Sequence, residues 1–216
     1  MDRRLLRLRL LPTIVALTVA FTAAGVQAQP LVFVDAAGLV DHDPTSFGPT
    51  GTVAGVGAGA GIMRSPHFSI RFEVDLPQWY VRGSSWRVRV LDHIEANSSR
   101  DARRTIAYSF LVAGHFKRRG PIQVALLAGL SVTDRVSRHS GFSDKLTLDG
   151  TLITHSPYDH RFAAHWLALA MGIDVAIAVT KHLSVVPRLR LYAYPLWAEV
   201  PSLFITRPGL AVRWQF

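Results

Sequence analysis

The sequence predicts an all-β fold, a closed antiparallel eight-stranded β-barrel. Apolar residues recur at every second position through most of the chain, and short connections alternate with long ones between these segments. Alternation with a period of two is typical of strands, and antiparallel strands in a closed sheet produce such connections. After residue 28 no stretch of 18 uninterrupted apolar residues remains, so membrane-spanning helices are not expected.

The composition excludes several classes of protein. The chain has 216 residues, enough for one domain or two very small ones. It contains no cysteine, which excludes disulfides, thiolate catalysis and cysteine-based metal sites. The net charge is +9, but 49% of the residues are hydrophobic and only 18% are charged. That composition is too apolar for a disordered or nucleic-acid-binding tail, so no nucleic-acid partner is expected.

The first 28 residues have the three parts of a secretory signal peptide. Arginines at positions 3, 4, 7 and 9 are followed by an apolar stretch over 10–24 and by Val26-Gln27-Ala28, which fits a cleavage site. The apolar stretch is short for a spanning helix, which disfavours an uncleaved anchor. We therefore expect a signal peptide at 1–28 and a single barrel domain at 29–216.

Seven segments show the strand alternation clearly, and an eighth, within Leu31–Val40, is poorly marked, with Asp35 as its only charge. Pro187 falls inside one segment, where it removes a ladder hydrogen bond, and we expect a bulge there. The seven segments are 52–63, 68–76, 106–116, 122–132, 167–179, 183–191 and 210–216.

The charges of these segments all lie on one face. The bulky apolar face of each segment carries no charge, whereas the opposite face is mostly Gly, Ala and Ser, with a few charges of both signs. This distribution indicates an apolar outer surface in lipid and a narrow polar lumen, as in a transmembrane barrel. In a soluble barrel the apolar face would instead line the core. The predicted lumen ionic network comprises Arg71, Glu73, Asp75, Asp174, Arg188, Arg190 and Arg213.

Aromatic residues near the predicted strand ends fit interfacial girdles, because their rings have one apolar end and one that can hydrogen-bond. These residues are Phe68, Trp79, Tyr80, Tyr108, Phe116, Trp166, Tyr192, Tyr194, Trp214 and Phe216.

The connections predict three short periplasmic turns and four external loops. The short ones are 63–66, 117–120 and 180–182, and the long ones are 41–51, 77–104, 134–160 and 193–205. Two long loops are rich in cations, which are either solvated loop charge or partners of lipopolysaccharide phosphates. These cations are Arg87, Arg89, Arg100, Arg103, Arg104, Arg135, Arg138 and Lys145.

The sequence predicts no catalytic, cofactor-binding or metal-binding residue. Ser109 and His115 share a face but lie six residues apart, roughly 20 Å along a strand. The glycines of 55–61 do not have the spacing of a dinucleotide fingerprint; close strand packing and curvature explain them better. Four histidines match no ligand set: His139, His155, His160 and His165.

The signal peptide, the alternating segments and the closing residues 209–216 resemble small eight-stranded outer-membrane β-barrel proteins of the OmpA/OmpX type, the outer membrane protein beta-barrel family. In that family the last strand ends in an aromatic residue, and its alternating apolar positions are read by the barrel-assembly machinery. The positions that match this assembly signal are Leu210, Val212, Trp214 and Phe216.

The resemblance implies a monomer in a bacterial outer membrane, with outer-membrane lipid, lipopolysaccharide and the barrel-assembly machinery as partners. The expected function is non-enzymatic: a structural or surface-interaction role through long external loops. A porin-like channel is less expected, because side chains fill lumens of eight strands. Two alternatives stay open: a secreted soluble barrel that binds a small apolar ligand, and an outer-membrane lipid-modifying enzyme.

Overall fold

The computed structural model describes residues 31–43, 51–116, 120–194 and 204–216. The predicted signal peptide and its cleavage site lie outside these residues and stay predictions. Among the described residues there is no helix that is long and apolar enough to cross a membrane.

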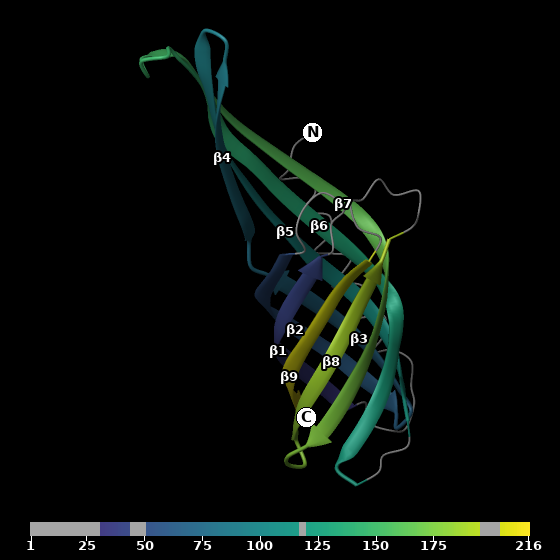
Figure 1. Cartoon of the computed structure of the whole chain (residues 1–216). Helices are drawn as coiled ribbons and strands as arrows, with labels where there is room; N and C mark the ends of the chain where they lie inside the picture. The colour runs from purple at the N-terminus through teal and green to yellow at the C-terminus, as the bar shows by residue number, and fades with distance from the viewer. Residues whose placement is uncertain (1–30, 44–50, 117–119, 195–203) are drawn as a thin grey trace. The chain divides into compact units, whose positions relative to one another are not determined.

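Every described element is a β-strand, and each pairs antiparallel with its neighbours (Figure 1). The order β3-β2-β1-β9-β8-β7-β6-β5 is closed by a β3–β5 pairing, which makes a ring of eight strands, while β4 pairs with β5 alone. The predicted closed eight-stranded barrel is confirmed. The strands are β1 (Leu31–Asp43), β2 (Gly51–Ser65), β3 (Phe68–Pro77), β4 (Tyr80–Val90), β5 (His93–His115), β6 (Ile122–Leu146), β7 (Leu152–Ala178), β8 (Leu183–Ala193) and β9 (Phe204–Gln215).

Three strands continue beyond the barrel. β5, β6 and β7 have 23, 25 and 27 residues, and their distal parts form a four-stranded sheet with β4 (Figure 1). We call this sheet, residues 80–104 and 134–164, the extension. The expectation of loops at 77–104 and 134–160 was therefore wrong. Most side chains on both faces of the extension are exposed or half-buried, so these stretches lack the apolar alternation that identifies a strand.

Pro187 does not cause a bulge. The β7–β8 register is the same on its two sides, at Asp174–Arg188 and at Ile177–Val185, and Pro187 itself pairs with Leu210 of β9. The expected bulge was wrong, because the proline only interrupts the pairing with β7 while the pairing with β9 continues.

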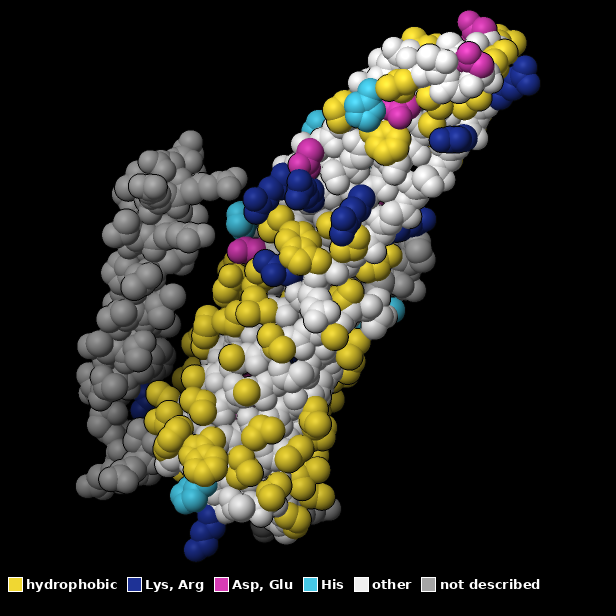
Figure 2. Space-filling view, turned by 90° about the vertical axis from the view of Figure 1, so that its left-hand side faces the viewer, with side chains coloured by type: hydrophobic (Ala, Val, Ile, Leu, Met, Phe, Trp, Pro, Cys, Tyr) yellow, Lys and Arg dark blue, Asp and Glu magenta, His cyan; other side chains and the backbone are white. Residues whose placement is uncertain are grey.

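The two faces of the barrel differ as predicted for a membrane barrel. Large apolar side chains point outward, among them Phe72, Leu126 and Leu210, whereas arginines and carboxylates are buried inside. Figure 2 shows hydrophobic side chains spread over the barrel, while most charged side chains gather over the extension. The arrangement is inverted relative to a soluble barrel.

Three of the ten aromatic residues assigned to girdles lie inside the barrel instead. Tyr192 and Tyr194 are buried, and Trp166 packs edge-on against Tyr194 with the ring centroids 6.4 Å apart. The reason is strand parity: Tyr192 lies an even number of residues from Arg188 and Arg190 and so shares their inward face. Outward exposure is seen for Phe68, Trp79, Tyr108, Phe116, Trp214 and Phe216.

Candidate functional site

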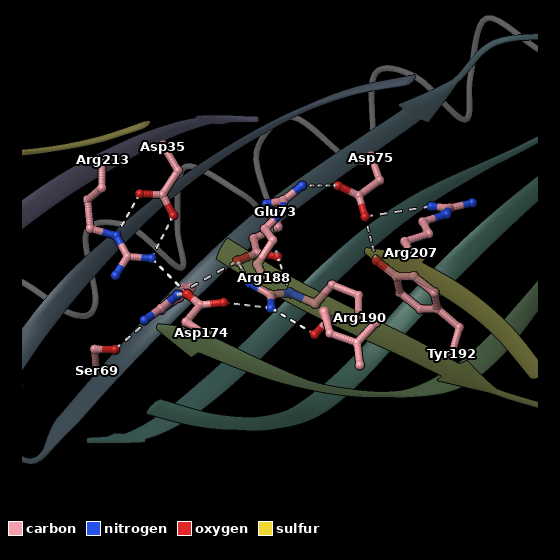
Figure 3. Close-up of polar contacts among 12 residues, drawn as sticks. Asp35, Ser69, Glu73, Asp75, Asp174, Arg188, Arg190, Tyr192, Arg207 and Arg213 are labelled. Atoms are coloured by element: carbon pink, nitrogen blue, oxygen red, sulfur yellow. Dashed lines mark hydrogen bonds and ion pairs between the residues drawn. The ribbon is translucent and has the colours of Figure 1, made fainter. Parts of the chain in front are cut away.

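The lumen contains a continuous network of ion pairs (Figure 3). Arg71, Glu73 and Asp75 reach it from β3, Asp174 from β7, Arg188 and Arg190 from β8, and Arg213 from β9; all seven side chains are buried. The structure brings together every residue of the predicted network.

Among the described carboxylates, Asp174 accepts hydrogen bonds from the largest number of arginines. It accepts hydrogen bonds from Arg71, from Nη1 of Arg190 at 2.7 Å and from Nη2 of Arg213 at 2.8 Å. One side chain of β7 therefore links β3, β8 and β9 across the lumen. Three guanidinium groups surround Asp174, so its negative charge is needed to hold them there.

Glu73 and Asp75 extend the network toward the extension. Arg190 donates two parallel hydrogen bonds to Glu73, at 2.8 and 2.7 Å. Asp75 accepts a hydrogen bond from Arg188 at 2.8 Å and another from the hydroxyl of Tyr192 at 2.8 Å. The two parallel bonds between Arg190 and Glu73 fix the orientation of the guanidinium group as well as neutralising its charge.

Three charged members of this network, Asp35, Asp41 and Arg207, were not among the residues predicted for it. Arg213 forks onto Asp35 at 2.7 and 2.9 Å, and Arg207 donates a 2.6 Å hydrogen bond to Asp41. With these residues the described lumen holds five arginines and five carboxylates, so its charges balance. Strand parity would have identified Arg207, because it lies six residues before Arg213 and residues an even number apart share a face of a strand.

The glycines of β2 make room for this network. A Cβ on Gly57 would lie 2.5 Å from Nη2 of Arg188 and 2.6 Å from Oδ1 of Asp75, and a Cβ on Gly61 would lie 2.3 Å from the Phe33 ring. The glycine run that the sequence analysis ascribed to close packing thus faces the lumen, where a methyl group would displace an ion pair or a ring.

The polar residues that could suggest catalysis have other partners. Ser109 donates a 3.1 Å hydrogen bond to Ser131, while His115 and Ser69 are hydrogen-bonded at 2.8 Å. The structure does not pair Ser109 with His115. Within the described part of the chain, no group of three residues is placed to hold a metal ion.

The four histidines considered in the sequence as metal ligands are paired across strands or stacked. His139 contacts Asp101, His155 lies 2.6 Å from Asp144, and His165 lies 2.6 Å from Asp134. His160 stacks on Tyr158, with the ring centroids 6.3 Å apart. These four residues are distributed along β6 and β7 rather than gathered as a ligand set.

The extension sorts its cations onto two faces, because residues paired across neighbouring strands share a face. One face is continuous with the lipid side of the barrel and is called the outer face; the other continues the lumen and is called the inner face. Arg87, Arg89, Arg100, Arg104 and Arg138 lie on the outer face, whereas Arg103, Arg135 and Lys145 lie on the inner face.

Two outer-face cations have defined partners. Arg138 forks onto Asp159 at 2.9 and 2.6 Å, which lowers the pKa of that carboxyl and raises the pKa of the guanidinium. Arg104 lies over the ring of Trp79, 5.0 Å from its centroid. The apolar outer side chains of the barrel, the apolar belt, reach Ile106 on β5 and Val132 on β6. Arg104 lies two residues beyond Ile106, and Arg138 lies six residues beyond Val132.

The residues of the predicted assembly signal share the outward face of β9. Leu210, Val212, Trp214 and Phe216 are 45–67% exposed. Arg213 lies between them and points into the lumen, 2% exposed.

No protein-family model matches the sequence, and no curated protein is similar to it. Solved structures are similar. Ail, the attachment invasion locus protein of Yersinia pestis, is 7% identical and has a TM-score of 0.51, with 88% of this chain and 100% of that chain covered. Its complex with the heparin analogue sucrose octasulfate matches at 9% identity and a TM-score of 0.50, with the same coverage.

Neisserial surface protein A is 17% identical, with 86% of this chain and 97% of that chain covered and a TM-score of 0.48. At such identities a likeness shows the fold alone. The chain has the fold of a small outer-membrane β-barrel, and the resemblance predicted from its sequence is confirmed at that level.

Replacing Asp174→Asn is expected to destabilise the barrel by about 3 kcal/mol or more, because three buried guanidinium groups lose their shared anion. The free energy of unfolding in detergent micelles, followed by tryptophan fluorescence against urea, measures this. The control is Asp159→Asn, whose ion pair with Arg138 is half exposed and should matter little. Equal effects of the two substitutions would contradict the importance of Asp174.

Replacing Gly57→Ala should also destabilise the barrel, by roughly 1–3 kcal/mol, because the new methyl group collides with the Arg188–Asp75 pair. The matched control is Gly38→Ala on the neighbouring strand β1, where nothing lies within 4 Å of the added Cβ. The same urea titration compares them. Loss of stability in Gly38→Ala alone would show that the glycines of β2 serve another purpose.

Proposed function

We propose that the protein is an integral, non-enzymatic β-barrel of a bacterial outer membrane that presents the extension for surface interaction. The observation that supports this most strongly is the inversion of the two faces. Apolar side chains cover the outside of the barrel, while five arginines and five carboxylates are paired within it. Lipid is the solvent that suits this outer face.

The side chains that fill the interior favour a closed, structural barrel rather than a porin-like channel. Large side chains from opposite strands meet in the lumen, such as Arg190 of β8 and Glu73 of β3. Phe33 lies under the guanidinium groups of Arg71 and Arg213, at 5.1 and 4.7 Å from the ring centroid. This polar filling also disfavours the alternative of a soluble barrel that binds an apolar ligand.

The extension supports the interaction role. It is a regular sheet rather than a set of loops, so its side chains have fixed positions from which to contact a partner. Ail, which shares the fold, has been solved with a heparin analogue. We propose that this chain also has a binding partner and contacts it through the extension.

The outer-face arginines support lipopolysaccharide as a partner. Arg104 and Arg138 lie just beyond the apolar belt on the same side of the sheet, at the level where phosphates of an outer leaflet would lie. Arginine forks suit phosphate groups. Outer-membrane lipid would then surround the belt, with lipopolysaccharide held at its rim.

We further propose that the barrel is a monomer and that the barrel-assembly machinery reads Leu210, Val212, Trp214 and Phe216. The outward orientation of these four side chains leaves them accessible before the last strand closes against β1 and β8.

The membrane location is tested by Leu126→Arg, in the middle of the belt, against Leu148→Arg at the end of the extension. The two leucines are 49% and 48% exposed, so in water both changes should be tolerated. In a bilayer Leu126→Arg should cost about 2–4 kcal/mol, whereas Leu148→Arg should cost little. The free energy of unfolding in lipid vesicles is measured for both variants. If neither substitution lowers it, the soluble alternative is favoured.

The lipopolysaccharide contact is tested by combining Arg104→Gln with Arg138→Gln. We expect several-fold less lipopolysaccharide to purify with the protein, because two cations at the rim are lost. The matched control combines Arg103→Gln with Arg135→Gln on the inner face. If both double variants retain the lipid equally, the cations are solvated charge.

A further inference from the structure

The outer face of the extension has a hollow of about 450 Å³ between β4, β5 and β6. Its floor is made of small side chains: Ser85 pairs with Ser98 across β4 and β5, and Ala96 beside them is 7% exposed. The volume is within the range of small-molecule sites. Nothing in the barrel requires this hollow, which lies far along the extension from the lumen network.

One end of the hollow is cationic. Arg87 pairs with Ala96 across β4 and β5 and is exposed. No carboxylate of the described residues forms an ion pair with its guanidinium. Arg87 is therefore available to an anionic group, with which a guanidinium forms strong, directional hydrogen bonds.

The other end combines a hydrogen-bond acceptor with an exposed ring. Asp144 lies in the same cross-strand row as Arg87 and Ala96, and its carboxylate is 2.6 Å from His155. Phe142 lies next to it on the same face, 37% exposed, with its ring centroid 5.6 Å from that of His155. His155 thus contacts both the carboxylate and the ring and helps to hold them in place.

This arrangement selects the class of ligand. The backbones of Arg87 and Asp144 are two strand spacings apart, roughly 10 Å, so a ligand that contacts both side chains must lie across β5. A sugar ring with a carboxylate can lay its C–H face on Phe142, donate hydroxyl hydrogens to Asp144 and direct its anion to Arg87. We propose that the hollow binds the uronic-acid unit of an acidic polysaccharide.

The proposal deepens the proposed surface-interaction role and rests on it. The probe is a hyaluronan tetrasaccharide, which contains glucuronic acid, compared with chitotetraose, a neutral sugar of the same length. Isothermal titration of the full chain in detergent micelles should give tighter binding of the acidic sugar. Arg87→Gln should weaken that binding about tenfold and leave chitotetraose unchanged, whereas Phe142→Ala should weaken both.

The matched control is Arg82→Gln, on the same strand five residues away and therefore on the inner face. It should bind the acidic sugar like the unchanged protein. Equal binding of the two sugars, equal losses in Arg82→Gln and Arg87→Gln, or no binding at all would each overturn the proposal. The comparison of Leu126→Arg with Leu148→Arg in vesicles tests the membrane location independently of sugar binding. Failure of the sugar site can therefore be distinguished from failure of the proposed function.

Discussion

The constraint on which the structure depends is the confinement of charge inside a ring of eight strands. Lipid outside the barrel cannot solvate an arginine, so each arginine at the level of the lipid must find its counter-charge across a narrow lumen. Asp174 meets this need for Arg71, Arg190 and Arg213. The glycines follow from the same constraint, because the guanidinium of Arg188 occupies the space that a side chain at Gly57 would fill.

Strand parity is a local property, and that explains which features could be predicted. It assigned Arg190 and Glu73 to the inward face, but it could not pair them, because they are 117 residues apart and their heights depend on the register of the intervening strands. Arg207 was not predicted because the last predicted segment begins at residue 210, whereas β9 begins at Phe204. Tyr192 lies near the end of β8, as a girdle residue would, but its parity with Arg190 turns it into the lumen.

The extension was not predictable as strand for a different reason. A strand is visible in a sequence when its two faces meet different surroundings. Beyond the barrel both faces of β4 are exposed from Val81 to Arg89, so no alternation is imposed on the residues. The strands there are specified by pairing with neighbours that are already aligned in the barrel, which a single segment does not reveal.

The alignment has a consequence for function. The β5–β6 register runs without a shift from His115–Ala125 to Ile94–Leu146, so one pair of strands passes from the barrel into the extension without changing its faces. The face that presents Phe110 and Leu130 in the barrel presents Arg104 and Arg138 a few residues further on. Since the geometry is continuous, the change from apolar to cationic side chains reflects a change in the surroundings. Its position marks the edge of the apolar belt.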